Sequence, residues 1–229
     1  MIGVVSSFAL IASLFFATAS QAATSSFSAR GNEPNWRVEI TEATITFQVI
    51  GGETVTLATK PNAQVSNGTE TFLARVNGQV FSLMIADQIC VDSMSGMPHP
   101  KTVVVKLGEQ TYSGCGGNPA SLLQGEWLID EIDGRAILAK SQPSIDFGPD
   151  GKLSGNGSCN RYFGPYVLSG EGLKISDVAS SMMACEQPLM EQEALLLKSL
   201  QETSRFEING EGVLVLRGGN GVSVVARRK

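Results

Sequence analysis

Histidine and charged side chains are scarce in this sequence of 229 residues. His99 is the single histidine, so a metal centre or a proton relay that needs several histidines is not expected. Only 17% of the residues are charged, and 17 lysines and arginines face 22 aspartates and glutamates, which gives a net charge of −5. This balance provides no general attraction to nucleic acid or to an anionic membrane surface, and we expect neither as a partner.

Apolar residues are plentiful enough to build a core. They make up 42% of the chain, and the mean hydropathy is +0.07. Such a composition excludes bulk disorder and predicts a folded protein.

The N-terminal stretch contains no charged side chain before Arg30. An apolar run from Ile2 to Ala17 leads into small residues that end at Ala22, which is the pattern of a secretory signal over residues 1–22. An uncleaved membrane anchor is the alternative, but the run is short for a span and contains serines. We therefore expect a periplasmic or secreted protein with no stable membrane span after cleavage.

The cysteines form an even set, Cys90, Cys115, Cys159 and Cys185. Four cysteines allow three pairings, and proximity in the sequence favours Cys90 with Cys115 and Cys159 with Cys185. Each bridge would close a loop of about 25 residues and stabilise the fold by about 3–4 kcal/mol. A zinc site using His99 is the alternative, but no Cys-x-x-Cys or His-x-x-x-His pair supports it. We expect two disulfides, no metal and no cofactor.

Alternating apolar residues and turn signals predict a mainly β (α+β) protein with two small antiparallel domains, at residues 23–120 and 121–229. Asn67-Gly68 and Asn77-Gly78 are hairpin-turn dipeptides, and the boundary falls in the glycine-rich stretch that ends at Pro119. Strands are expected at residues 36–40, 44–49, 79–86, 102–107, 126–132, 144–147, 173–175, 205–208, 213–217 and 222–226.

One segment has helical spacing instead. Residues 187–202 carry a stripe of leucines on one side and polar residues on the other, which predicts an amphipathic helix packed on the sheet of the second domain. The basic end, residues 227–229, is interpreted as a solvated tail.

The second half resembles the META (HslJ-like) domain family. The resemblance is carried by Gly125-Glu126-Trp127, by the segment from Gly155 to Tyr166, and by Met182-Met183-Ala184-Cys185. It implies a β-rich domain with one helix, often exported or lipoprotein-anchored, and associated with heat shock, envelope stress or antibiotic tolerance. It implies no enzymatic activity.

The first half resembles a less-described exported domain that often precedes META domains. The matching residues are Gly31–Trp36, Cys90–Gly96 and Tyr112–Gly117. The cysteines within these motifs agree with the pairing favoured above.

Three segments are candidate binding loops. The turn at residues 31–36 offers Glu33 and Trp36, the segment 90–100 offers Asp92, Ser93 and His99, and the segment 155–166 offers Asn160, Arg161 and Tyr162. For each loop a structural role is the alternative: Trp36 can fill a core, and Asn160 can satisfy backbone groups. A Ser–His–Asp hydrolase built on His99 would lack a Gly-x-Ser-x-Gly elbow.

We therefore expect a non-catalytic, exported cell-envelope protein of the stress-response or tolerance class. It would bind an unknown protein or small molecule through these loops. The alternatives are a periplasmic inhibitor of a lysozyme-like, cell-wall-degrading enzyme and, less favoured, a secreted hydrolase that uses His99.

Overall fold

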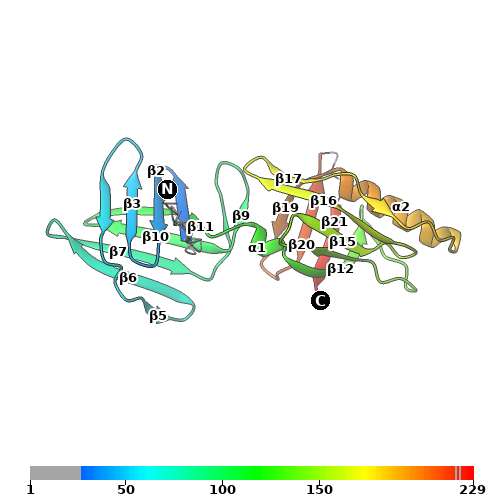
Figure 1. Cartoon of the computed structure of the whole chain (residues 1–229), viewed down its shortest axis with the longest axis horizontal. Helices are drawn as coiled ribbons and strands as arrows, with labels where there is room; N and C mark the ends of the chain where they lie inside the picture. Colours follow the sequence, from blue (N-terminus) through cyan, green and yellow to red (C-terminus); the bar gives the residue numbers. More distant parts are fainter. Residues whose placement is uncertain (1–26, 220, 222) are drawn as a thin grey trace, which may run out of the picture.

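The structure is a computed structural model and describes residues 27–219, 221 and 223–229. The predicted secretory signal, residues 1–22, lies outside the described residues. The described chain forms two barrel-like β domains that lie side by side along the long axis of the molecule (Figure 1). The prediction of a mainly β, two-domain protein is thus confirmed.

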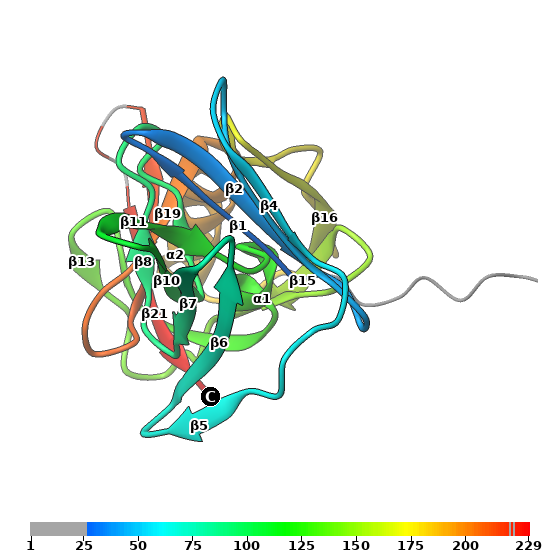
Figure 2. The same ribbon diagram turned by 90° about the vertical axis from the view of Figure 1, so that its left-hand side faces the viewer.

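The N-terminal domain is one nine-stranded antiparallel sheet, ordered β4-β3-β2-β1-β11-β10-β7-β6-β5. The sheet folds over on itself, so that β2 and β3 lie across β7 and β10 (Figures 1 and 2). Its strands are β1 (Phe27–Asn32), β2 (Asn35–Ile40), β3 (Ile45–Val49), β4 (Thr54–Leu57), β5 (Gln64–Ser66), β6 (Thr69–Val76), β7 (Gln79–Ala86), β10 (Lys101–Leu107) and β11 (Gln110–Gly116).

Aromatic rings join the two layers of this sheet. Phe47 in β3 lies 5.1 Å from Tyr112 and 6.3 Å from Phe81, between ring centroids. Alternation explains the inward set, because Trp36 is buried in β2 whereas the neighbouring Arg37 is exposed.

The predicted hairpin turns are confirmed. Asn67-Gly68 joins β5 to β6 and Asn77-Gly78 joins β6 to β7, with positive φ at every one of these residues. Two successive positive φ values match the right-handed twist of the flanking strands, which is why this dipeptide recurs in tight hairpins.

The C-terminal domain is a ten-stranded antiparallel sheet along the path β17-β16-β15-β14-β12-β21-β20-β19, with β13 beside β12 and β18 beside β16. Its two ends meet: at Gly172 in β17, an added Cβ would lie 2.2 Å from the carbonyl oxygen of Ser204 in β19. The strands are β12 (Gly125–Ile132), β13 (Arg135–Ala136), β14 (Ser144–Phe147), β15 (Lys152–Asn156), β16 (Arg161–Ser169), β17 (Gly172–Ile175), β18 (Ala179–Ser180), β19 (Thr203–Ile208), β20 (Leu214–Gly218) and β21 (Ser223–Arg228).

The predicted amphipathic helix is α2 (Gln187–Gln201), which lies along this barrel (Figure 1). Leu196 and Leu200 are fully buried in the core, as the leucine stripe predicts. No described helix is long and apolar enough to cross a membrane.

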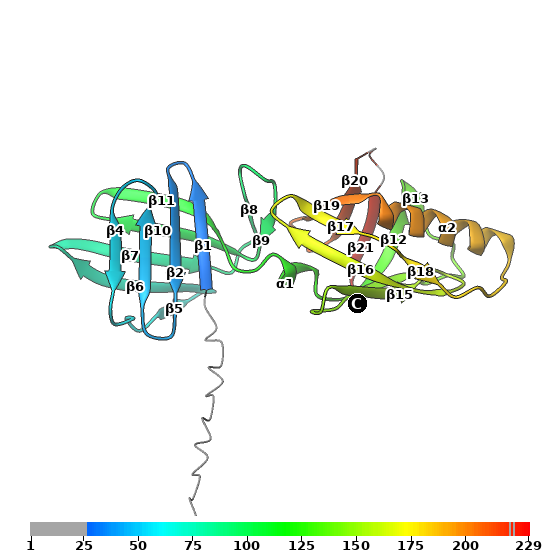
Figure 3. The same ribbon diagram turned by 45° about the horizontal axis from the view of Figure 1, so that its top comes forward.

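The link between the domains contains a short helix, α1 (Ala120–Leu123), and a small hairpin, β8 (Cys90–Val91) with β9 (Pro98–His99). The hairpin stands between the two domains (Figure 3). Met97, the last residue of its connecting loop, is buried in the hydrophobic cluster of the C-terminal domain although it belongs to the N-terminal chain segment.

The basic C-terminus is not a solvated tail. Arg228 lies over the ring of Trp127, 4.2 Å from its centroid, and donates to the carbonyl of Leu122 at 2.9 Å. Lys229 pairs with Glu126 at 2.9 Å. These contacts tie the last strand to the segment that joins the domains.

Candidate functional site

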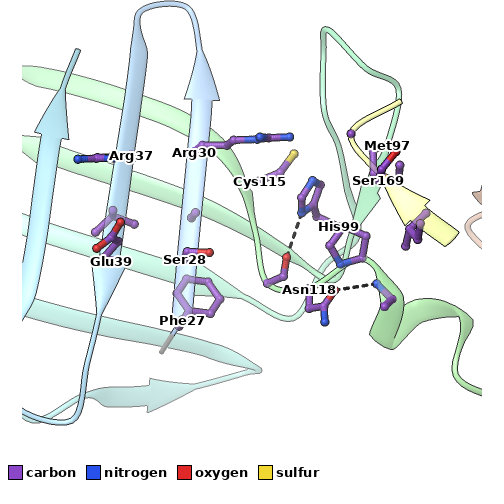
Figure 4. Close-up of a pocket in the computed structure, with 17 residues that line it drawn as sticks. Phe27, Ser28, Arg30, Arg37, Glu39, Met97, His99, Cys115, Asn118 and Ser169 are labelled. Carbon is purple, nitrogen blue, oxygen red and sulfur yellow. Dashed lines mark hydrogen bonds between the residues drawn. The ribbon is translucent and has the colours of Figure 1, made fainter. Parts of the chain in front are cut away.

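An open cleft of about 800 Å³ lies where the two domains meet (Figure 4). One wall is the outer face of β1 and β2, a second is the β8–β9 hairpin with the start of the linker, and the third is the turn from β16 to β17. Phe27, Met97 and Leu168 supply apolar surface from each of these parts. The cleft therefore requires both domains.

The strand wall of the cleft carries two arginines directly opposite each other. Arg30 in β1 and Arg37 in β2 are cross-strand partners in the register of the sheet. Like charges in this position are destabilising unless something compensates them. Arg37 donates through Nε to the side chain of Gln48 at 2.9 Å, and Arg30 Nε lies 3.9 Å from the carboxylate of Asp92.

Arg30 points towards Cys115 and the hairpin rather than towards Arg37 (Figure 4). Its side chain remains 56% exposed, so its guanidinium can still reach a ligand. Glu39, which also lines the cleft, is the only acidic residue among the lining residues. The described lining thus has a small excess of positive charge.

Asp92 fixes the conformation of the β8–β9 loop, residues 92–97. Its Oδ1 accepts hydrogen bonds from the amides of Met94 and Ser95 and from the Ser95 hydroxyl, at 2.8–3.1 Å. Burial by itself would raise the pKa of this carboxyl, but the bonds from Ser95, Asn32 and Met94 outweigh it and lower the pKa to about 2. Asp92 is therefore a charged anchor at neutral pH.

His99 is buried at the base of the cleft, with 8% of its surface exposed. Its Nδ1 lies 3.1 Å from the carbonyl of Gly117, so Nδ1 carries the proton (Figure 4). Its Nε2 is buried without a hydrogen-bond partner among the described residues. Cys90 is its cross-strand partner, which places the imidazole beside the Cys90–Cys115 disulfide.

Two of the candidate loops predicted from the sequence come together. Asn32, at the tip of the β1–β2 hairpin, donates to the Ser93 hydroxyl at 3.1 Å and to Asp92 at 3.3 Å. Glu33 is exposed at that tip, whereas Trp36 is 1% exposed and donates to the carbonyl of Ser113 at 3.3 Å. The Trp36 ring is thus part of the core.

The third candidate segment lies in the other domain and is mostly strand. Residues 152–156 form β15 and 161–169 form β16, so only residues 157–160 connect them. The inward alternation of Tyr162, Gly164 and Tyr166 is a strand pattern, but Gly164 and Pro165 obscured it in the sequence.

The connecting residues 157–160, the Cys159 loop, are held by a buried acid of α2. Glu193 accepts from the amides of Cys159 and Asn160, at 3.2 and 2.6 Å, and from the Asn160 side chain at 2.9 Å. Asn160 also binds both backbone groups of Met183. Its amide is thereby fully occupied in joining the loop, the helix and the segment before Cys185.

The two neighbours of Asn160 differ in exposure. Tyr162 is 1% exposed and donates to the carbonyl of Ser144 at 2.8 Å, and burial raises the pKa of its phenol. Arg161 is exposed on the outer face of β16. Arg161 is thus the accessible member of this set.

Sequence reasoning missed Arg30, Arg37 and Met97. The two arginines were available from alternation alone, because both are outward residues of strands that flank the turn at residues 31–36. Met97 carried no such signal, because its burial depends on contact with the second domain.

Both disulfides predicted from the sequence are present, Cys90–Cys115 and Cys159–Cys185. They are consistent with an extracellular or periplasmic location. Among the described residues, no group of three or more acidic, cysteine or histidine side chains is arranged to hold a metal ion.

Two solved structures are similar to about half of this chain. An NMR structure of a protein from Burkholderia xenovorans is 23% identical, covering 48% of this chain and 86% of that one, with a TM-score of 0.41. A second NMR structure is 24% identical, covering 48% of this chain and 94% of that one, with a TM-score of 0.40. No curated protein matches the chain.

The family comparison is more informative. The META domain model matches residues 120–229, which span α1 and every strand of the second sheet. The resemblance of the first half to an exported domain remains a prediction. The C-terminal half of the chain therefore matches the META domain family.

Proposed function

We propose that this is an exported, non-catalytic binding protein of the cell envelope, whose ligand occupies the cleft between the domains. The single observation that carries the proposal is the cleft itself, of about 800 Å³, with walls from both domains. Ligand sites concentrate at domain interfaces and have volumes in this range. The apolar walls and the arginine pair favour a small amphipathic ligand that carries negative charge.

Export is supported by the two disulfides, because such bridges persist in oxidising compartments. A role in stress or antibiotic tolerance rests on the match to the META domain family alone. A deletion strain with altered heat or drug tolerance would support that part of the proposal.

The absence of catalysis is supported by the surroundings of His99. Its Nδ1 faces the carbonyl of Gly117 rather than a carboxylate, and the oxygens of Asp92 are taken up by the turn and by Asn32. A Ser–His–Asp relay needs the acid to orient the imidazole. Loss of a measured hydrolysis in a His99→Ala variant would overturn this part.

The cleft is tested with 8-anilinonaphthalene-1-sulfonate, an amphipathic organic anion whose fluorescence rises in apolar sites. We expect saturable binding to the folded mature protein. Arg30→Gln should weaken it about tenfold, because a charge-assisted hydrogen bond contributes about 1.5–3 kcal/mol.

Arg75→Gln is the matched control, since Arg75 is exposed on β6 and does not line the cleft. Circular dichroism of both variants checks that they fold. Absence of saturable binding, or equal weakening by both substitutions, would contradict a ligand in the cleft.

An inhibitor of a cell-wall-degrading enzyme is the second candidate, and the β8–β9 loop favours it. Met94 in this loop is 81% exposed, and Val91 in the adjoining strand β8 is 61% exposed; a disulfide and Asp92 hold the hairpin in place. A rigid exposed apolar tip suits insertion into a partner. Inhibition of a lysozyme-type muramidase that Met94→Asp abolishes would favour this function over small-ligand binding.

A further inference from the structure

The C-terminal sheet has a second hollow, remote from the cleft. A groove of about 860 Å³ lies on the outer face of the sheet formed by β21, β12, β14, β15 and β16. Its lining shares no residue with that of the cleft, so the two sites are independent. Nothing in the proposed function uses it.

The floor of the groove consists of two rows of side chains that run across the strands. The register of the sheet aligns the members of each row and places them on its outer face. One row is Leu128, Ser144, Asn156 and Arg161, and the next is Glu126, Asp146, Ser154 and Phe163.

An aromatic ring stands at the end of the second row. Phe163 is 63% exposed and is the only aromatic residue among the exposed large apolar side chains of the described residues. Its neighbour in the row is the small Ser154, so the ring has open space beside it. An exposed aromatic ring beside hydrogen-bonding groups is suited to contact with a ligand rather than to packing in the core.

The charges in the groove cancel. Three acidic residues and three basic residues line it, Glu126, Asp130, Asp146, Arg161, Arg227 and Lys229. Arg227 pairs with Asp130 at 3.2 Å, and Lys229 pairs with Glu126 at 2.9 Å. Asp146 and Arg161 make no ion pair with other described residues, so their hydrogen-bonding capacity is free.

One feature of the floor opposes stability. Glu126 and Asp146 are direct cross-strand partners, and like charges in that position are destabilising. Lys229 neutralises Glu126, so Asp146 is the carboxylate left without a counter-ion among the described residues, and Ser154 separates it from Phe163 along the row.

We propose that this groove binds a neutral carbohydrate chain. The C–H face of a sugar ring would stack on Phe163, because the face of an aromatic ring is electron-rich. The hydroxyl groups of the sugar would donate to Asp146 and accept from Arg161, while Asn156 can do both.

The balance of charge separates this ligand from the alternatives. A nucleic acid or a polyanionic glycan would need a net positive surface, which the groove lacks. A peptide strand would pair with a sheet edge, whereas these residues lie on the face of inner strands.

The test is isothermal titration and NMR of the full mature protein with cellotetraose, maltotetraose and chitotetraose. We expect at least one of these neutral oligosaccharides to bind and to shift backbone amide signals of β15 and β16. Phe163→Ala should weaken that binding about tenfold, and Asp146→Asn should weaken it as well.

Val167→Ala is the matched control, because Val167 is an exposed apolar residue of the same strand, 61% exposed, outside the groove. It should leave the affinity unchanged. No binding of any of the three sugars, equal effects of Phe163→Ala and Val167→Ala, or preferential binding of a heparin tetrasaccharide would overturn the proposal.

Discussion

Each domain combines a disulfide with a loop that a buried carboxylate holds, but the carboxylate is placed differently in the two. Each has one disulfide, with sequence separations of 25 and 26, and each has a short loop next to one of its cysteines that a buried carboxylate holds, the β8–β9 loop and the Cys159 loop. Asp92 belongs to the loop that it organises, whereas Glu193 comes from α2 and reaches the Cys159 loop from outside.

This difference separates two structural roles. Asp92 holds the β8–β9 loop through hydrogen bonds to residues of the loop itself. The loop can therefore extend away from the N-terminal sheet and place Met97 in the core of the C-terminal domain. Because Glu193 is on the helix, the Cys159 loop fastens α2 to its own barrel. The bonds of Asp92 thus stabilise a loop at the boundary between the domains, beside the cleft, whereas the bonds of Glu193 stabilise contacts within the C-terminal domain.

Each domain contains one tryptophan that can report on its unfolding. Its two tryptophans are Trp36 and Trp127, each 1% exposed in the core of a different domain. Labelling with 5-fluorotryptophan therefore gives one ¹⁹F signal for each domain, so that unfolding of the two domains can be followed separately.

The largest effect is expected from removing one disulfide at a time. Replacing Cys90 and Cys115 by alanine, or Cys159 and Cys185, should each lower the free energy of unfolding by about 3.5 kcal/mol, from the entropy of a loop of this length. The first variant should affect mainly the Trp36 signal and the second the Trp127 signal, in urea titrations. Equal losses at both signals in either variant would contradict separate bracing.

Removal of the Glu193 side chain should come next. Glu193→Ala leaves the amides of Cys159 and Asn160 buried without an acceptor, and should cost about 3 kcal/mol in the Trp127 transition. Glu191→Ala, on the exposed side of the same helix, should change stability by less than about 0.5 kcal/mol. If the two substitutions had the same effect, Glu193 would not be the anchor of the loop.

The regular parts of this comparison were predictable from the sequence. The disulfide pairing followed from spacing, the Asn-Gly hairpins from their turn chemistry, and α2 from its leucine stripe. These signals are local, so they survive without knowledge of tertiary contacts.

The sites were less predictable because they depend on distant segments. The cleft exists only where the turn from β16 to β17 approaches β1, and the groove arises from the register of five strands. The single histidine drew attention to residues 90–100, yet the exposed groups that line the cleft include Arg30 and Arg37 on the neighbouring strands.

The next effect is the loss of stability of one domain when a residue in the chain segment of the other is replaced. Met97→Ala removes a buried side chain from the C-terminal core and should lower the stability reported by Trp127 by about 2.5 kcal/mol, although Met97 lies in the N-terminal chain segment. Met94→Ala is the control, since Met94 is 81% exposed on the same loop. A loss confined to the Trp36 signal would show that the loop does not couple the domains.

The smallest effect concerns how the free energy of unfolding depends on pH under acidic conditions. The pKa of Asp92 is about 2 in the folded protein against an ordinary 3.8, so the charged form stabilises the fold above pH 4. That contribution, about 2 kcal/mol, should disappear as the pH falls from about 4 to 2. It is measured as the difference between the unfolding free energies of the parent protein and Asp92→Asn, followed at Trp36.

Asparagine at position 92 can still accept the bonds from Ser95 through its side-chain oxygen, so the variant should fold without the titrating charge, although its amide nitrogen cannot accept the bond from Asn32. The difference between the two proteins should therefore narrow on acidification and be larger at Trp36 than at Trp127. Parallel pH profiles would mean that neutral hydrogen bonds, rather than the carboxylate charge, hold the loop that forms one wall of the cleft.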